Sequence, residues 1–97
     1  MQIFVEQHPE LAVITIDLEG AVLTPKDLVD IHYPSVNPRL GVIINGRAPI
    51  WLYATFLHQY HYCAFTGIND PRLGAVITAT HHPDYAVGDV LSISVNT

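Results

Sequence analysis

Histidine, aspartate and arginine side chains between residues 58 and 82 have the types and spacing of a site that acts on phosphate. His58 and His61 are three residues apart in a predicted helix, so their side chains share one face of it. Asp70 and Arg72 stand in a predicted turn, and His81 closes the apolar segment that follows. Imidazole and carboxylate groups suit a divalent transition metal such as manganese or zinc. An arginine fork matches phosphate oxygens, so the cluster predicts metal-assisted phosphate chemistry.

The histidines also have structural interpretations, which the sequence leaves open. A lone helical histidine is commonly a half-buried residue whose hydrogen bonds are satisfied, and this alternative holds for His58 and His61. His8 and His32 are interpreted as ordinary surface residues. His82 precedes a proline in a predicted turn and is interpreted as accessory.

A second candidate site is the run Asn45-Gly46-Arg47-Ala48-Pro49, which leads from a predicted strand end into a predicted helix. Free N–H groups and the helix dipole at such a position attract anions. Gly46 lets a ligand approach the backbone. The run is neither a Walker motif nor a dinucleotide fingerprint, so it predicts an anion cradle without naming the anion. A structural role in the turn is the alternative for Arg47.

One segment of the chain is nearly repeated further on. The two copies are Asn37-Pro38-Arg39-Leu40-Gly41 and Asp70-Pro71-Arg72-Leu73-Gly74. Each leads into an apolar strand, so the repeat reflects either convergent turn chemistry or two related half-sites for anions.

A βαβ unit is the scaffold that we expect to position these side chains. A strand over 40–45, a helix over 49–60 and a strand over 62–68 predict this unit, which is normally right-handed. The other predicted elements are a hairpin of strands 2–7 and 11–18, a short helix over 25–30, and strands 73–81 and 90–95. The predicted fold class is α+β, with a mixed sheet of about five to six strands.

The strand over 73–81 raises a distance problem for the candidate site. At ~3.3 Å per residue it would be roughly 27–30 Å long, so His81 cannot lie near Asp70 in the same hairpin arm. If both residues serve one site, two copies of the chain form it, or the strand is bent or shorter than predicted.

Length and composition bound the remaining possibilities. The chain has 97 residues, 49% hydrophobic and 13% charged, with a net charge of −5. This length fits one domain over 1–97, and the sparse charge predicts apolar surface that faces a partner subunit. A duplex DNA partner is disfavoured, because binding it requires a basic face. With Cys63 as the one cysteine and no signal-peptide or membrane-spanning pattern, we expect a cytoplasmic protein without a membrane partner.

The motifs along residues 34–90, taken in order, resemble the small CRISPR-associated ring nucleases of the Csx-three family, also called CRISPR ring nuclease three. They are Pro34-Ser35-Val36, Gly46-Arg47-x-Pro49-Ile50-Trp51-Leu52-Tyr53, His58-x-x-His61, Asp70-Pro71-Arg72-Leu73-Gly74-x-Val76, His81 and Gly88-Asp89-Val90. The resemblance implies a Rossmann-like fold related to the CRISPR-associated Rossmann superfamily, built as a homodimer. It implies a manganese-dependent phosphodiesterase that degrades cyclic tetra-adenylate to linear di-adenylate, and stacking of dimers into tetramers or filaments around the ligand.

The resemblance also assigns roles to residues. It implies catalytic roles for His58, His61, Asp70 and Arg72, manganese ligation by His61, Asp70 and His81, and ligand binding by Ser35, Asn45, Gly46, Arg47 and Pro49. Family members often have Ser-Gly-Arg-Gly-Pro where this chain has Asn45 and Ala48 in the binding loop. Two alternatives stay open. One is a manganese-dependent 3′ exoribonuclease or deadenylase acting on short oligoadenylate RNA, and the other is a non-catalytic module that binds cyclic oligoadenylate.

Overall fold

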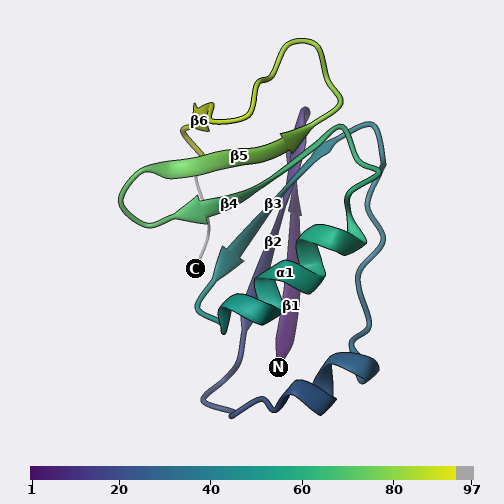
Figure 1. Ribbon diagram of the computed structural model, residues 1–97, viewed down its shortest axis with the longest axis vertical. Helices are drawn as coiled ribbons and strands as arrows, with labels where there is room; N and C mark the ends of the chain where they lie inside the picture. Colours follow the sequence, from purple (N-terminus) through teal and green to yellow (C-terminus); the bar gives the residue numbers. More distant parts are fainter. Residues whose placement is uncertain (94–97) are drawn as a thin grey trace.

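Three segments rich in β-branched residues form the parallel centre of the sheet in a computed structural model, which describes residues 1–93 (Figure 1). Strands β2 (Leu11–Asp17), β3 (Gly41–Gly46) and β4 (Phe65–Asp70) pair in parallel. The antiparallel strands are β1 (Gln2–Gln7) beside β2, β5 (Gly74–Thr80) beside β4, and β6 (Val90–Leu91) beside β5. The predicted α+β class and mixed sheet are therefore confirmed, with the strand order β1-β2-β3-β4-β5-β6.

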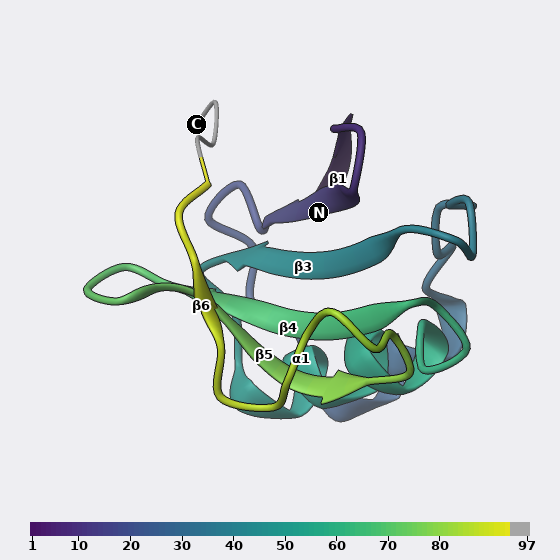
Figure 2. The ribbon, with the colours of Figure 1, turned by 90° about the horizontal axis from the view of Figure 1, so that it is seen from above.

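Helix α1 (Ile50–Gln59) covers one face of this sheet (Figure 2). Leu52 and Phe56 of the helix are fully buried against side chains of β2 and β3, which include Ile14 and Val42. The predicted helix over 49–60 is confirmed, with Pro49 and Tyr60 as its caps. Its position between the parallel strands β3 and β4 confirms the βαβ unit.

The 3-10 helix η1 (Pro25–Asp30) confirms the predicted short helix and lies near the same face of the sheet. The Asp27 carboxylate accepts a hydrogen bond of 2.7 Å from the N–H of Thr24, which holds the first turn. Leu28 packs, partly buried, against the cluster beneath α1. The long connection from β2 to β3 thus contributes to the same core as the main helix.

The opposite face of the sheet has a smaller core. Its buried side chains come from β2 to β5, and Tyr85, Leu91 and Ile93 of the C-terminal segment cover them in part. The buried members are Leu11, Val13, Ile43, Phe65, Ala75 and Ile77. Figure 2 shows the segment after β6 leaving toward this face, away from α1. Because apolar cores cover both faces of the sheet, polar side chains can gather only at the ends of the strands.

The predicted boundaries of the strand after α1 were wrong. Residues 62–64 are in turns instead, because the N–H of His61 bonds to the carbonyl of His58 and that of Cys63 to the carbonyl of Tyr60. Strand β4 extends to Asp70 rather than ending at residue 68, since Asp70 pairs with Gly74 of β5. The predicted last strand over 90–95 is present as Val90–Leu91, and residues 94 and 95 lie outside the described part.

Candidate functional site

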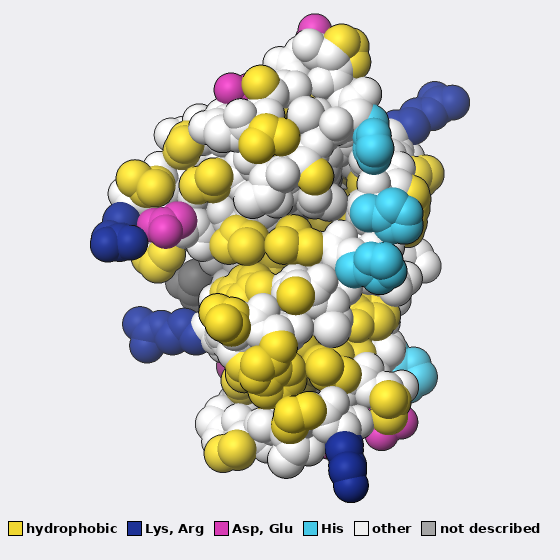
Figure 3. Space-filling model, in the orientation of Figure 1, with side chains coloured by type: hydrophobic (Ala, Val, Ile, Leu, Met, Phe, Trp, Pro, Cys, Tyr) yellow, Lys and Arg dark blue, Asp and Glu magenta, His cyan; other side chains and the backbone are white. Residues whose placement is uncertain are grey.

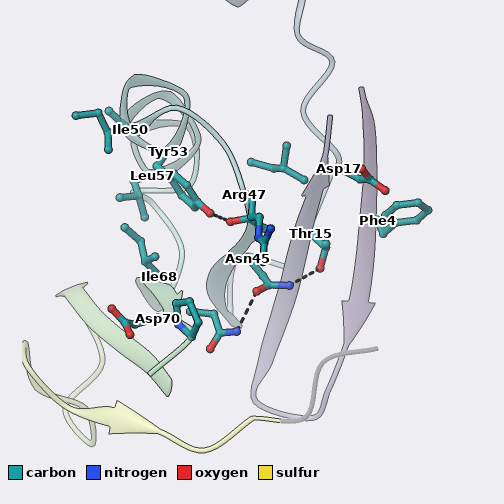
Figure 4. A pocket seen from close by; sticks show the side chains of 15 residues that line it. Phe4, Thr15, Asp17, Asn45, Arg47, Ile50, Tyr53, Leu57, Ile68 and Asp70 are labelled. Atoms are coloured by element: carbon teal, nitrogen blue, oxygen red, sulfur yellow. Dashed lines mark hydrogen bonds between the residues drawn. The ribbon is translucent and has the colours of Figure 1, made fainter. Parts of the chain in front are cut away.

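A cavity of about 940 Å³ opens at the carboxyl ends of the three parallel strands (Figure 4). Its walls come from the ends of β2, β3 and β4, from the β3–α1 loop, and from one side of α1. The lining residues used below are Thr15, Asn45, Gly46, Arg47, Tyr53, Asn69 and Asp70. Ligands of α/β sheets commonly bind at this edge, because polar loops converge there beyond the apolar interior. The cavity is therefore the candidate ligand site.

A row of hydrogen-bonded polar side chains crosses the three parallel strands at the cavity. Asn69 of β4 donates from Nδ2 to Oδ1 of Asn45 over 2.9 Å. Asn45 of β3 in turn donates from its own Nδ2 to Oγ1 of Thr15 on β2 over 3.1 Å. The side chains sit beside one another because these strands are neighbours in the sheet. The row satisfies the largely buried Asn45 amide and fixes its orientation.

The predicted binding loop forms the rim of the cavity. Gly46 has φ +120°, and a Cβ on it would lie 2.2 Å from the carbonyl oxygen of Ile16, so the loop requires glycine here. The Tyr53 hydroxyl of α1 donates to the Gly46 carbonyl and ties the loop to the helix. Arg47 is exposed and lines the cavity at the N-terminal end of α1. Of the predicted ligand-binding residues, Asn45, Gly46 and Arg47 line the cavity, whereas Ser35 and Pro49 do not.

The turn after β4 presents a carboxylate and a guanidinium. Oδ1 of Asp70 accepts hydrogen bonds from the N–H groups of Arg72 (2.8 Å) and Leu73 (3.1 Å). These bonds hold the pKa of Asp70 below its usual value, with the nearby Arg72 charge adding to the effect. The Nε atom of Arg72 lies 3.8 Å from Oδ1 of Asp70, and its side chain is 87% exposed. Asp70 therefore stays ionised, and Arg72 is available to a second molecule.

The predicted catalytic histidines meet at the opposite end of the β4–β5 hairpin. The rings of His58 and His61 stack with centroids 5.4 Å apart. Nδ1 of His61 lies 2.8 Å from the carbonyl oxygen of His58, and Nε2 of His81 lies 3.0 Å from that of His61. Figure 3 shows histidine side chains gathered along one edge of the molecule. Residues far apart in the sequence thus form one exposed histidine edge, consisting of His58, His61 and His81.

These two bonds determine which ring nitrogens carry protons. A carbonyl oxygen only accepts, so Nδ1 of His61 and Nε2 of His81 must be the donors. In the neutral rings this leaves Nε2 of His61 and Nδ1 of His81 with free lone pairs. Fixing the second nitrogen on a carbonyl is how proteins orient metal-binding imidazoles.

One chain does not unite the predicted metal ligands. The histidine edge lies at the end of β5, whereas Asp70 and Arg72 lie at its start. The residues of β5 place the two ends about 20 Å apart at ~3.3 Å per residue. Among residues 1–93, no group of three or more His, Cys, Asp or Glu side chains could hold a metal ion. The set of His61, Asp70 and His81 can therefore act together only if two copies of the chain meet.

Sequence reasoning missed four polar residues of the cavity: Thr15, Asp17, Tyr53 and Asn69. Thr15 stands near the end of a β-branched strand, where it suits the strand as well as a site. Tyr53 lies in a largely apolar helix, and Asn69 lies just past the end of the predicted strand over 62–68. For the residues on β2 and β4, the available signal was their position near strand ends of one sheet, and only the strand order makes it informative.

Comparison with known proteins identifies a family model and a similar protein. Residues 16–92 match the family model described as CRISPR-associated protein (Cas_csx3). An uncharacterized protein from Aquifex aeolicus (strain VF5) is 42% identical over 74 residues, which are 71% of this chain and 67% of that protein. The range matched by the family model contains the cavity loop, the histidine edge and the Asp70 turn, and it excludes Thr15.

Proposed function

Because the chain belongs to the Csx3 family of CRISPR-associated proteins, we propose that it is a manganese-dependent phosphodiesterase that degrades cyclic tetra-adenylate to linear di-adenylate. The observation that carries the proposal is the division of the chemistry between two ends of one chain. A cavity with a glycine loop, Arg47 and Asp70 lies at one end, and the histidine edge lies at the other. Two copies stacked end to end would place a ring of phosphates between these surfaces.

The cavity end suits an anionic nucleotide despite the net charge of −5. Arg47 lines the cavity and Arg72 follows the lining residue Asp70, so two of the four Lys and Arg residues stand at this end. The N-terminus of α1 adds unpaired N–H groups and the positive end of its dipole beside Arg47. The apolar lining from α1 offers a surface for bases.

The donor set suits manganese once two copies meet. His61 and His81 of one copy would supply their free imidazole nitrogens, and Asp70 of another copy would supply its carboxylate. When bound there, the ion would polarise the scissile phosphate and offset the charge that develops on it.

The remaining steps fall to side chains of this chain. Arg72, exposed beside Asp70, would stabilise the negative charge on the phosphate oxygens. His58 would accept the proton of the attacking group as a general base, or His61 would do so instead of holding the ion. The nucleophile would be the ribose 2′-hydroxyl or a water molecule. As its oxygen bonds to phosphorus, the bond from phosphorus to the leaving ribose oxygen breaks, and that oxygen takes up a proton. Product ends distinguish the two nucleophiles, because a 2′,3′-cyclic phosphate requires the hydroxyl.

The assembly is part of the proposal. We expect a homodimer as the unit and stacking of dimers into tetramers or filaments when the ligand binds, because neither end has a complete set of groups. A cytoplasmic location follows from the proposed substrate. Among the described residues, no helix is long and apolar enough to cross a membrane.

The test is incubation with cyclic tri-, tetra- and hexa-adenylate, with manganese and with EDTA. We expect conversion of the tetramer ring in manganese and its loss in EDTA. His61→Ala should abolish conversion, whereas His32→Ala, which removes an exposed histidine from another part of the chain, should not. Wild-type rates for His61→Ala would refute the assignment.

The same incubations, with linear poly-adenylate added as a substrate, distinguish two alternative functions. Faster degradation of linear poly-adenylate than of the ring would indicate a 3′ exoribonuclease or deadenylase. Tight binding of the ring without conversion would indicate a non-catalytic module that binds cyclic oligoadenylate.

A further inference from the structure

The polar row across the cavity leaves specific hydrogen-bonding groups unused. An asparagine amide offers two N–H donors and an oxygen with two lone pairs. Asn69 donates one N–H to Asn45. Within residues 1–93, its Oδ1 accepts no hydrogen bond. Asn69 therefore retains one donor and one acceptor on adjacent atoms.

Asn69 is better placed than Asn45 to use these groups on a ligand. Asn45 is 9% exposed and is bonded on both sides, by Asn69 to its oxygen and to Thr15 from its nitrogen. Asn69 is only partly buried and lines the cavity. Because its amide nitrogen is anchored to Asn45, the amide cannot rotate freely, and its free oxygen has a fixed direction. Asn45 is thus placed to orient the Asn69 amide rather than to contact a ligand itself.

An adjacent donor and acceptor match the N6/N7 edge of adenine. Adenine presents its N6 amino group beside an acceptor ring nitrogen, and asparagine pairs with this edge through two hydrogen bonds. Hypoxanthine has an oxygen in place of the amino group, so it would face the Asn69 oxygen with a second acceptor. A row that holds Asn69 in one orientation therefore favours adenine.

We propose that Asn69 reads the adenine base of the substrate in the cavity and that Asn45 is its positioning residue. This inference rests on the proposed function, since it names how the same site selects adenylate. It assigns base recognition to the end of β4, one residue before Asp70. The residue that recognises the base and the carboxylate proposed for phosphate chemistry would then be neighbours at the end of β4.

The experiment compares equilibrium binding of cyclic tetra-adenylate with that of the same ring carrying hypoxanthine in place of adenine. It uses the wild type, Asn69→Ala and Asn69→Leu, with Gln7→Ala as a matched control that removes an exposed amide away from the cavity. We expect the wild type to prefer the adenine ring. Asn69→Ala should lower this preference by about 5- to 150-fold, the range that one bidentate base contact supplies. Asn69→Leu keeps the shape but lacks both the acceptor oxygen and the N–H donors, so it should lower the preference as well.

The ratio of the two affinities separates base reading from a structural role. Equal weakening for both rings, with the preference unchanged, would overturn the inference, because it would mean that Asn69 only supports the cavity. Should Asn69→Ala fail to fold, Asn69→Leu gives the same comparison. Conversion is measured in parallel. If the protein binds the adenine ring selectively through Asn69 but does not convert it, the proposed phosphodiesterase activity is refuted and base recognition is supported. If the protein binds neither ring, both proposals are refuted.

Discussion

Mixing two inactive variants tests whether the site forms between copies of the chain. His61→Ala removes a ring from the histidine edge, and Asp70→Asn removes the carboxylate at the other end of the β4–β5 hairpin. The residues of β5 separate these ends by about 20 Å, so no single chain can bring both groups to one phosphate. A composite site takes its histidines from one copy and its carboxylate from another. Each variant then still has the half that the other has lost.

The expected magnitude follows from random assembly. In an equal mixture, half of the histidine edges come from Asp70→Asn chains and are intact, and half of the carboxylate ends come from His61→Ala chains and are intact. Both are intact in about one composite site in four, so activity should return to roughly a quarter of the wild-type rate. Each variant alone should have less than about a hundredth of that rate, as expected when a group of a concerted set is removed.

The assay is conversion of cyclic tetra-adenylate in manganese after the two variants are unfolded together and refolded. A chain carrying both substitutions, refolded with either variant, should restore nothing. The same doubly substituted chain refolded with wild type should leave about a quarter of the sites active, against about half if each chain held its own complete site. A mixture no more active than its components would refute the shared site.

Three further predictions concern the scaffold, each followed by thermal or urea unfolding. Asp70→Asn should keep its turn, because Asn37 makes the same bond to the N–H of Arg39 at 3.0 Å. The depressed pKa of Asp70 means that its carboxylate contributes stability above an unfolded pKa of about 3.9, lost as the pH falls through the folded value, so the variant should lack this acid dependence. Gly41→Ala would place a Cβ 2.1 Å from the buried Phe65 ring and should cost about 1–3 kcal/mol, whereas an unchanged midpoint would contradict this tight contact. Tyr60→Phe leaves the Pro34 carbonyl unpaired and should cost about 1 kcal/mol. Burial raises the pKa of Tyr60, so wild-type stability should fall above pH of about 10, and this loss should be smaller in the variant.

Local sequence determined most of the elements. Runs of apolar and β-branched residues marked the first hairpin and β3, and Thr24 followed by Pro25 marked the start of the short helix. The β4 boundaries were missed because Tyr62 and Cys63 look like strand residues, although local bonds from the end of α1 hold them in turns. The length of the strand after Arg72 already predicted that His81 and Asp70 lie apart. The type and length of a helix or strand depend mainly on residues close together in the chain, so they can be predicted from the sequence.

Tertiary structure alone decided which distant side chains meet. Thr15, Asn45 and Asn69 form one row because β2, β3 and β4 are adjacent and parallel in this register. The period of a strand predicts which face a residue occupies but not which strand lies beside it. His61 and His81 likewise meet only because β4 and β5 pair antiparallel, so that the start of one adjoins the end of the other. Long-range pairing of strands sets both arrangements, and its contacts join residues that are far apart along the chain.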